Sequence, residues 1–138
     1  MNLTIDTFAW AEMIRGGELS ARAREAMEQA DLCLTPSIVL AEVASICVRA
    51  GFEALTVEAE LEAIRESSMI VPIDQTIAIA GAHAAEELRA SARARGIPLP
   101  GLAEGLVLAI ARGSRSNLLS GDPHFRECPE TVWLGEVR

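Results

Sequence analysis

Residues 118–125 read LLSGDPHF, a short apolar run that closes on an acidic turn. The leucines predict a short buried strand, and the Gly-Asp-Pro sequence after them is typical of a turn. Near the other end of the chain, the apolar residues 3–5 (LTI) end in the same way on Asp6. The carboxyl ends of parallel strands share one edge of a sheet, so we expect Asp6 and Asp122 to lie there together.

Between these two strands, short apolar runs alternate with helical patterns. The predicted strands are 3–5, 32–34, 69–73 and 118–119, with a weaker fifth at 131–134, and the predicted helices are 8–14, 18–30, 36–50, 56–66, 75–94 and 102–112. Strands that are joined through helices form a parallel sheet covered on both faces. We therefore expect a single α/β domain over residues 1–138, with a mainly parallel sheet of four to five short strands.

Three helix starts carry polar residues that bear on structure or function. Thr35 precedes Pro36, which predicts a hydroxyl N-cap followed by a proline in the first turn. Asp74 stands before the longest helix and is expected to cap it rather than to join a site. Glu104, in the first turn of the last helix, either interacts with the helix dipole or binds a ligand, and the residues alone leave both interpretations open.

The composition limits the chemistry. All 12 basic residues are arginines, which disfavours P-loop and Schiff-base enzymes because both depend on a lysine ammonium. The three cysteines have no CxxC spacing and the two histidines are far apart, so a metal ion would need oxygen ligands. A formal net charge of -8 argues against nonspecific coating of nucleic acid. With neither a long apolar run nor a basic leader, the chain is expected in the cytoplasm and away from membranes.

Each candidate residue also has a purely structural interpretation. Asp6 and Asp122 could be ordinary turn or cap residues. Glu42 is harder to explain in this way, because it interrupts an apolar helical stretch where an unpaired carboxylate would be costly. His124 could touch a substrate, but we expect a loop histidine at the rim of the site to be solvated. Arg112 and Arg115 are either phosphate contacts or ordinary surface residues.

Three stretches together resemble the PIN domain, the ribonuclease fold that includes the VapC-type toxins. They are IDTFAW at 5–10, TPSIVLAEV at 35–43 and LLSGDPHF at 118–125, and the resemblance covers nearly the whole chain. PIN proteins begin with a strand that ends in an aspartate and a hydroxyl residue, which match Asp6 and Thr7 here.

Further positions follow the pattern of the PIN family. A second acid in the helix after strand two is matched by Glu42. The late motif of Thr or Ser, any residue, Asp, two residues and Phe is matched by Ser120, Asp122 and Phe125. The third acid of the family is usually an aspartate that opens the helix before this motif. Glu104 stands at that place and is one methylene longer.

The resemblance implies a three-layer α/β/α fold with a metal site. Hard cations such as Mg²⁺ and Mn²⁺ prefer oxygen ligands, and phosphodiester cleavage uses a metal to activate water. The residues that it implies are Asp6, Glu42, Glu104 and Asp122 as ligands of one or two such ions, with Thr7 and Ser120 in support.

The resemblance also implies a metal-dependent endoribonuclease, the toxin of a type II toxin-antitoxin pair. RNA is then the substrate, a homodimer the expected assembly and a small antitoxin protein the partner. One alternative is a PIN-like module that binds RNA or protein with weak or no catalysis. Another is a phosphohydrolase of the haloacid dehalogenase type, but this class needs a lysine and a second aspartate where Phe8 stands.

Overall fold

Five short parallel strands form the central sheet of the computed structural model, which describes residues 1–136. The strands are β1 (Asn2–Ile5), β2 (Leu32–Pro36), β3 (Met69–Val71), β4 (Asn117–Ser120) and β5 (Thr131–Trp133). Their order across the sheet is β3-β2-β1-β4-β5, and each neighbouring pair is parallel. The chain thus runs outward from β1 to β3 and then returns to the other side of β1. The strand order reverses between β1 and β4, where parallel sheets bind ligands.

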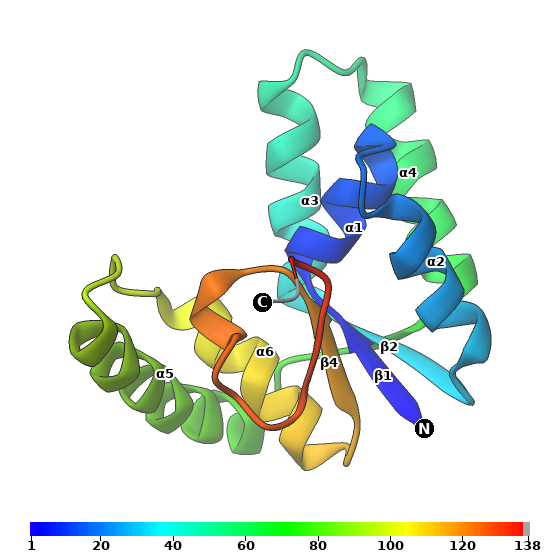
Figure 1. Cartoon of the computed structure of the whole chain (residues 1–138). Coiled ribbons are helices and arrows are strands. Elements are labelled where there is room, and N and C mark those ends of the chain that lie inside the picture. Colours follow the sequence, from blue (N-terminus) through cyan, green and yellow to red (C-terminus); the bar gives the residue numbers. More distant parts are fainter. Residues whose placement is uncertain (137–138) are drawn as a thin grey trace.

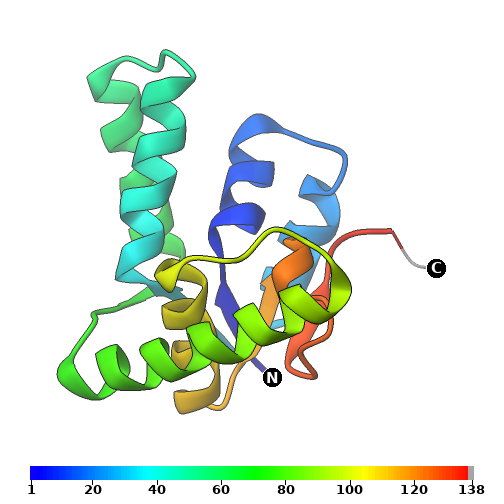
Figure 2. The same ribbon diagram turned by 90° about the vertical axis from the view of Figure 1, so that its left-hand side faces the viewer.

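Helices cover both faces of this sheet. They are α1 (Thr7–Arg15), α2 (Ser20–Gln29), α3 (Ser37–Arg49), α4 (Ala54–Ser67), α5 (Gln75–Arg95) and α6 (Leu102–Gly113), and a short 3-10 turn, η1 (Pro123–Phe125), follows β4. The pair α5 and α6 lies on one side of the sheet and α1 and α2 on the other, as Figure 1 shows. The hairpin of α3 and α4 projects beyond the strands (Figure 2). The predicted three-layer α/β/α fold is confirmed.

Helix α6 is the most deeply buried helix and is fixed by close packing. Seven consecutive residues, from Gly105 to Ala111, are buried, and the helix packs against β1, β2 and β4. Its contact with α5 uses small residues. A β-carbon added to Gly105 would lie 2.3 Å from the carbonyl oxygen of Gly81 and 2.7 Å from the backbone nitrogen of Ala85. This close approach fixes the first turns of α6 against α5.

The prediction that Thr35 caps α3 is wrong. Thr35 lies in β2, whose pairing with β3 continues through Pro36. Its buried hydroxyl accepts a hydrogen bond from the Trp10 indole at 3.1 Å and lies 2.7 Å from the Ser68 hydroxyl. The hydroxyl therefore joins β2 to two other elements, and the strand register, rather than local capping, decides its role.

Other local predictions agree better with the structure. Asp74 caps α5 as predicted, because its carboxylate accepts a hydrogen bond from the backbone N–H of Ile77 at 2.8 Å. Helix α4 begins at Ala54, slightly before the predicted start at Thr56. The three cysteines are free thiols. Within residues 1–136, none of the helices combines the length and apolar character that a membrane crossing requires.

Candidate metal centre

The register of β1 against β4 brings the first and the last predicted acid together. Ile5 pairs with Leu119, so the residues that follow, Asp6 and Ser120, lie side by side at the carboxyl edge of the sheet. The Ser120 hydroxyl donates a hydrogen bond to the Asp6 carboxylate. The same oxygen accepts a hydrogen bond from the backbone N–H of Asp122 at 2.9 Å. One serine therefore holds both acids in place.

Asp6 is buried, with only 3% of its surface exposed. Its Oδ1 accepts a hydrogen bond from the backbone N–H of Ala9 at 2.9 Å and thereby caps α1. Burial raises the pKa of Asp6 from its ordinary 3.8 to about 7. The hydrogen bonds from Ser120 and Ala9 lower this pKa, whereas the charges of Asp122 and Glu42 raise it further. Charging Asp6 is costly in the protein alone, and a nearby cation would reverse that cost.

Glu42 reaches the same place from the middle of α3. The hydroxyl of Thr7, the first residue of α1, donates a hydrogen bond to Glu42 Oε1 at 2.7 Å. Burial is the main cause that raises the pKa of Glu42. The bond from Thr7 opposes this change, and the charges of Glu104 and Asp122 add to it. Among the described residues, no ion pair joins Asp6 or Glu42 to a basic side chain, so the charged form of each carboxyl group is uncompensated.

Glu104, for which the sequence left a structural role and a ligand role open, opens α6 and shows the structural one. Its Oε2 accepts a hydrogen bond from the backbone N–H of Gly101 at 2.9 Å, so the side chain caps its own helix. The same side chain lines the cavity that the other acids face. A metal ion bound here would have to share this carboxylate with the cap or draw it away.

The four predicted acids line one cavity of about 220 Å³. Its other lining residues are Thr7, Phe8, Val107 and Phe125. None of the described residues in this lining is basic, and Arg112 instead forms ion pairs with Glu87 and Glu130, each at 2.7 Å. Of the two interpretations of Arg112, the structure thus supports the surface residue. Several converging carboxylates fit a hard divalent cation.

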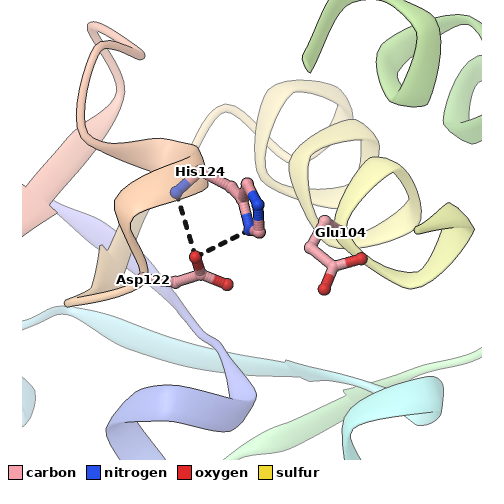
Figure 3. Close-up of side chains that lie close together, drawn as sticks. All are labelled: Glu104, Asp122 and His124. Atoms are coloured by element: carbon pink, nitrogen blue, oxygen red, sulfur yellow. Dashed lines mark hydrogen bonds and ion pairs between the residues drawn. The ribbon is translucent and has the colours of Figure 1, made fainter. Parts of the chain in front are cut away.

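A histidine that we expected to be solvated belongs to this site. The ring of His124 lies beside Asp122 and faces Glu104 (Figure 3), and its side chain is only 19% exposed. Its Nδ1 is 2.9 Å from Asp122 Oδ1, and its Nε2 is 2.7 Å from the carbonyl oxygen of Pro98. One ligand atom from each of Glu104, Asp122 and His124 lies within 4.8 Å of the others. The prediction for His124 is therefore wrong, although its position just after Asp122 in a tight turn was a usable signal.

Comparison with known proteins gives the family. The sequence profile of the PIN domain matches residues 3–130, which include all four acids. A toxin-antitoxin complex from Klebsiella pneumoniae superposes with a TM-score of 0.68 at 20% identity over 98% of this chain and 99% of that chain. VapBC2 from Rickettsia felis, bound to a DNA fragment from its promoter, gives a TM-score of 0.68 at 16% identity over 96% and 97%.

A further similar structure is Mycobacterium tuberculosis VapC20, described as a sarcin-ricin loop cleaving toxin. Its TM-score is 0.61 at 16% identity, over 87% of this chain and 91% of that chain. No curated protein sequence matches the chain. At such low identities the structures show a shared fold, and the profile match extends over most of the sequence. The predicted resemblance is confirmed: the chain belongs to the PIN domain family.

Proposed function

We propose that this protein is a divalent-metal-dependent endoribonuclease and the toxin of a VapBC-like toxin-antitoxin pair. The observation that carries the proposal is the convergence of four carboxylates on one cavity in a PIN domain. Carboxylates that are packed together raise one another's pKa values, and a bound cation relieves the repulsion. The raised pKa values of Asp6 and Glu42 support such a role.

In this proposal the four acids hold one or two Mg²⁺ or Mn²⁺ ions. Such a metal, when bound, supplies an activated water and offsets the charge that grows on the phosphodiester. The residues of the chain prepare the site. The hydrogen bond from Thr7 directs the Glu42 carboxylate, and the hydrogen bond from Ser120 directs the Asp6 carboxylate. These supports keep the ligands oriented before a metal arrives, which reduces the reorganisation that binding requires.

The charge distribution supports metal dependence in RNA binding as well as in chemistry. The protein carries a formal net charge of -8, and the lining of the cavity contributes acids and no described basic side chain. RNA phosphates would therefore be repelled from the cavity of the metal-free protein. Divalent ions held by the four acids would supply the positive charge that makes the approach of the phosphates favourable. We expect EDTA to weaken RNA binding at the cavity as well as to stop cleavage.

We also propose an antitoxin partner and a homodimer. The support is that this fold recurs in toxin-antitoxin complexes such as those from Klebsiella pneumoniae and Rickettsia felis. Val48, Leu55 and Ile79 are each more than half exposed on helices, and apolar surface of this kind is often covered by partners. Light scattering tests the homodimer. Co-purification with the small protein of a neighbouring gene tests the antitoxin.

Cleavage of defined RNAs tests the central proposal. The purified protein is incubated with single-stranded RNA, structured RNA and a sarcin-ricin loop hairpin, in Mn²⁺, Mg²⁺ or EDTA. The variant Asp6→Asn removes one proposed ligand. The matched control is Asp74→Asn, because Asp74 caps a helix in the same way as Asp6 but is exposed and lies outside the cavity.

The expected result is cleavage that needs the metal, disappears in Asp6→Asn and persists in Asp74→Asn. Equal inactivity of the folded wild type and Asp6→Asn on every RNA, with either metal, would contradict the nuclease and favour a binding module. Cleavage that is unchanged in EDTA would contradict the metal centre. A contaminating nuclease is recognised because it would act equally in all three proteins.

A further inference from the structure

The two ring nitrogens of His124 have different surroundings. Nε2 lies 2.7 Å from the carbonyl oxygen of Pro98. A carbonyl oxygen only accepts hydrogen bonds, so Nε2 carries the ring hydrogen, and in the neutral ring Nδ1 presents a lone pair. Nδ1 is buried and has no hydrogen-bond partner among residues 1–136, although it lies only 2.9 Å from Asp122 Oδ1.

In the neutral ring this arrangement places two acceptors against each other, whereas in a protonated ring Nδ1–H would donate to Asp122. A nitrogen lone pair beside a carboxylate oxygen is repulsive when no hydrogen atom lies between them, and a buried acceptor without a partner is costly. A cation bound by both atoms would turn the repulsion into attraction. Glu104 completes the group from the other side, with its ligand atom within 4.8 Å of those of His124 and Asp122 (Figure 3).

The spacing suits one small ion after a minor adjustment. Metal bonds of about 2.1 Å allow two ligand atoms of one ion to lie up to about 4.2 Å apart. Closing the widest gap in the group therefore needs a movement of less than about 1 Å, which rotation of the Glu104 side chain can supply.

We infer that Nδ1 of His124 binds the same divalent ion as Glu104 and Asp122. This inference rests on the proposed metal centre and adds a nitrogen ligand to a set that otherwise consists of carboxylates. The hydrogen bond to Pro98 is the kind of outer contact that fixes the tautomer of a ligating histidine. Both Mg²⁺ and Mn²⁺ prefer oxygen ligands, but Mn²⁺ accepts an imidazole nitrogen more readily than Mg²⁺ does, so this ligand shifts the relative affinity of the site toward Mn²⁺.

Pulsed electron paramagnetic resonance of the Mn²⁺-loaded protein tests this ligand directly, because a bound imidazole gives a characteristic ¹⁴N modulation. The full chain has only two histidines, so a preparation without a histidine tag allows assignment. His83 is exposed on α5 and lies outside the cavity, which makes His83→Gln the matched control. His124→Gln keeps an amide that can donate to Pro98 in place of Nε2 but removes Nδ1. His124→Asn keeps a polar group near Nδ1 but loses the Pro98 contact.

The wild type and His83→Gln are expected to show the modulation, and His124→Gln is expected to lose it. Calorimetry should show Mn²⁺ affinity at least about tenfold lower in His124→Gln, while Mg²⁺ affinity changes by less than about threefold. Circular dichroism and thermal unfolding establish that each variant is folded.

Three results would overturn the inference. The first is a wild type that binds Mn²⁺ without ¹⁴N modulation. The second is modulation that persists in His124→Gln. The third is a His124→Gln variant that binds Mn²⁺ as tightly as the wild type, together with a His124→Asn variant that has lost Mn²⁺ affinity. The last result would make His124 a positioning residue that acts through Pro98. These outcomes leave the proposed nuclease intact. A wild type that binds no Mn²⁺ and cleaves no RNA would instead contradict the metal centre itself.

Discussion

Replacing Asp6 by asparagine is expected to stabilise the metal-free protein at neutral pH, although it removes the proposed activity. The Asp6 carboxyl is buried, and its pKa is raised from 3.8 to about 7. An amide has almost the same shape and no charge. Its oxygen can still accept the hydrogen bond from the backbone N–H of Ala9 that caps α1.

The magnitude follows from the two pKa values. Each pKa unit is worth about 1.4 kcal/mol, so a displacement from 3.8 to about 7 corresponds to about 4 kcal/mol between the two protonation states. Because the folded pKa is raised, the favourable contribution is fully present below pH 3.8 and is lost as the pH rises through about 7. The isoelectric point of about 4.7 makes work below pH 5.5 impractical. Of the total loss of stability, about 2 kcal/mol falls between pH 5.5 and 8.5, where it can be measured.

Urea unfolding in EDTA at several pH values measures the effect. The free energy of unfolding of Asp6→Asn minus that of the wild type should rise by about 2 kcal/mol from pH 5.5 to 8.5. The subtraction removes the titration of groups that both proteins share. Asp74→Asn is the control, because it replaces an exposed capping aspartate, and its difference from the wild type should stay constant over this range.

Mn²⁺ should reduce the stability advantage of Asp6→Asn over the wild type. At a free concentration 100 times its dissociation constant, a bound ion stabilises the folded state by about 2.7 kcal/mol, and the wild type should gain this more fully than Asp6→Asn. A difference in unfolding free energy that does not change with pH would refute the reasoning, since it would show that Asp6 is readily charged in the folded protein. A difference that falls with rising pH would refute its sign.

Three further predictions test the surroundings of the site. Glu104→Asp should lower the free energy of unfolding in EDTA by about 0.5–1 kcal/mol, because the shorter side chain loses its hydrogen bond to the Gly101 N–H. Metal-dependent RNA cleavage should persist in this variant. Urea unfolding that is unchanged from the wild type would contradict the capping role. Gly105→Ala should cost about 1–3 kcal/mol in urea unfolding, because its methyl group would meet the carbonyl oxygen of Gly81, and a neutral result would show that α5 and α6 separate easily. Arg112→Ala should lower the free energy of unfolding by at most about 1 kcal/mol, because the ion pairs of Arg112 are partly exposed. It should leave RNA cleavage unchanged, and a loss of cleavage would give Arg112 a role in binding phosphate.

The fold and the proposed site were predictable where a local pattern determines a position. Asp6 and Asp122 each follow a short apolar run, and in a parallel sheet this alone assigns both to one edge. Glu42 was detectable because a carboxylate in an apolar helical stretch needs a reason to be there. The parallel sheet and its helical layers were predicted from the alternation of strands and helices together with the resemblance to a family, whereas the order of the strands was not predicted.

The errors arise where a long-range contact overrides the local signal. Thr35 and Pro36 have the chemistry of a helix start, but pairing with β3 extends β2 through both residues, and Trp10 and Ser68 engage the threonine hydroxyl. His124 looked like a loop residue because the segment that accepts its hydrogen bond comes from the connection between α5 and α6. No local pattern specifies where that connection lies.

The buried carboxylate of Asp6 links the stability of the fold to its proposed use. The β1 and β4 register that completes the sheet also places Asp6 beside Ser120, whose single hydroxyl donates to Asp6 and accepts from the backbone of Asp122. The sheet therefore cannot form without bringing the two acids together. Because burial and the charges of Asp122 and Glu42 raise the pKa of Asp6, we expect correct folding to create a site that is more stable with a cation than without one. A measured gain in stability on adding Mn²⁺ would consequently report both correct strand pairing and occupancy of the proposed site.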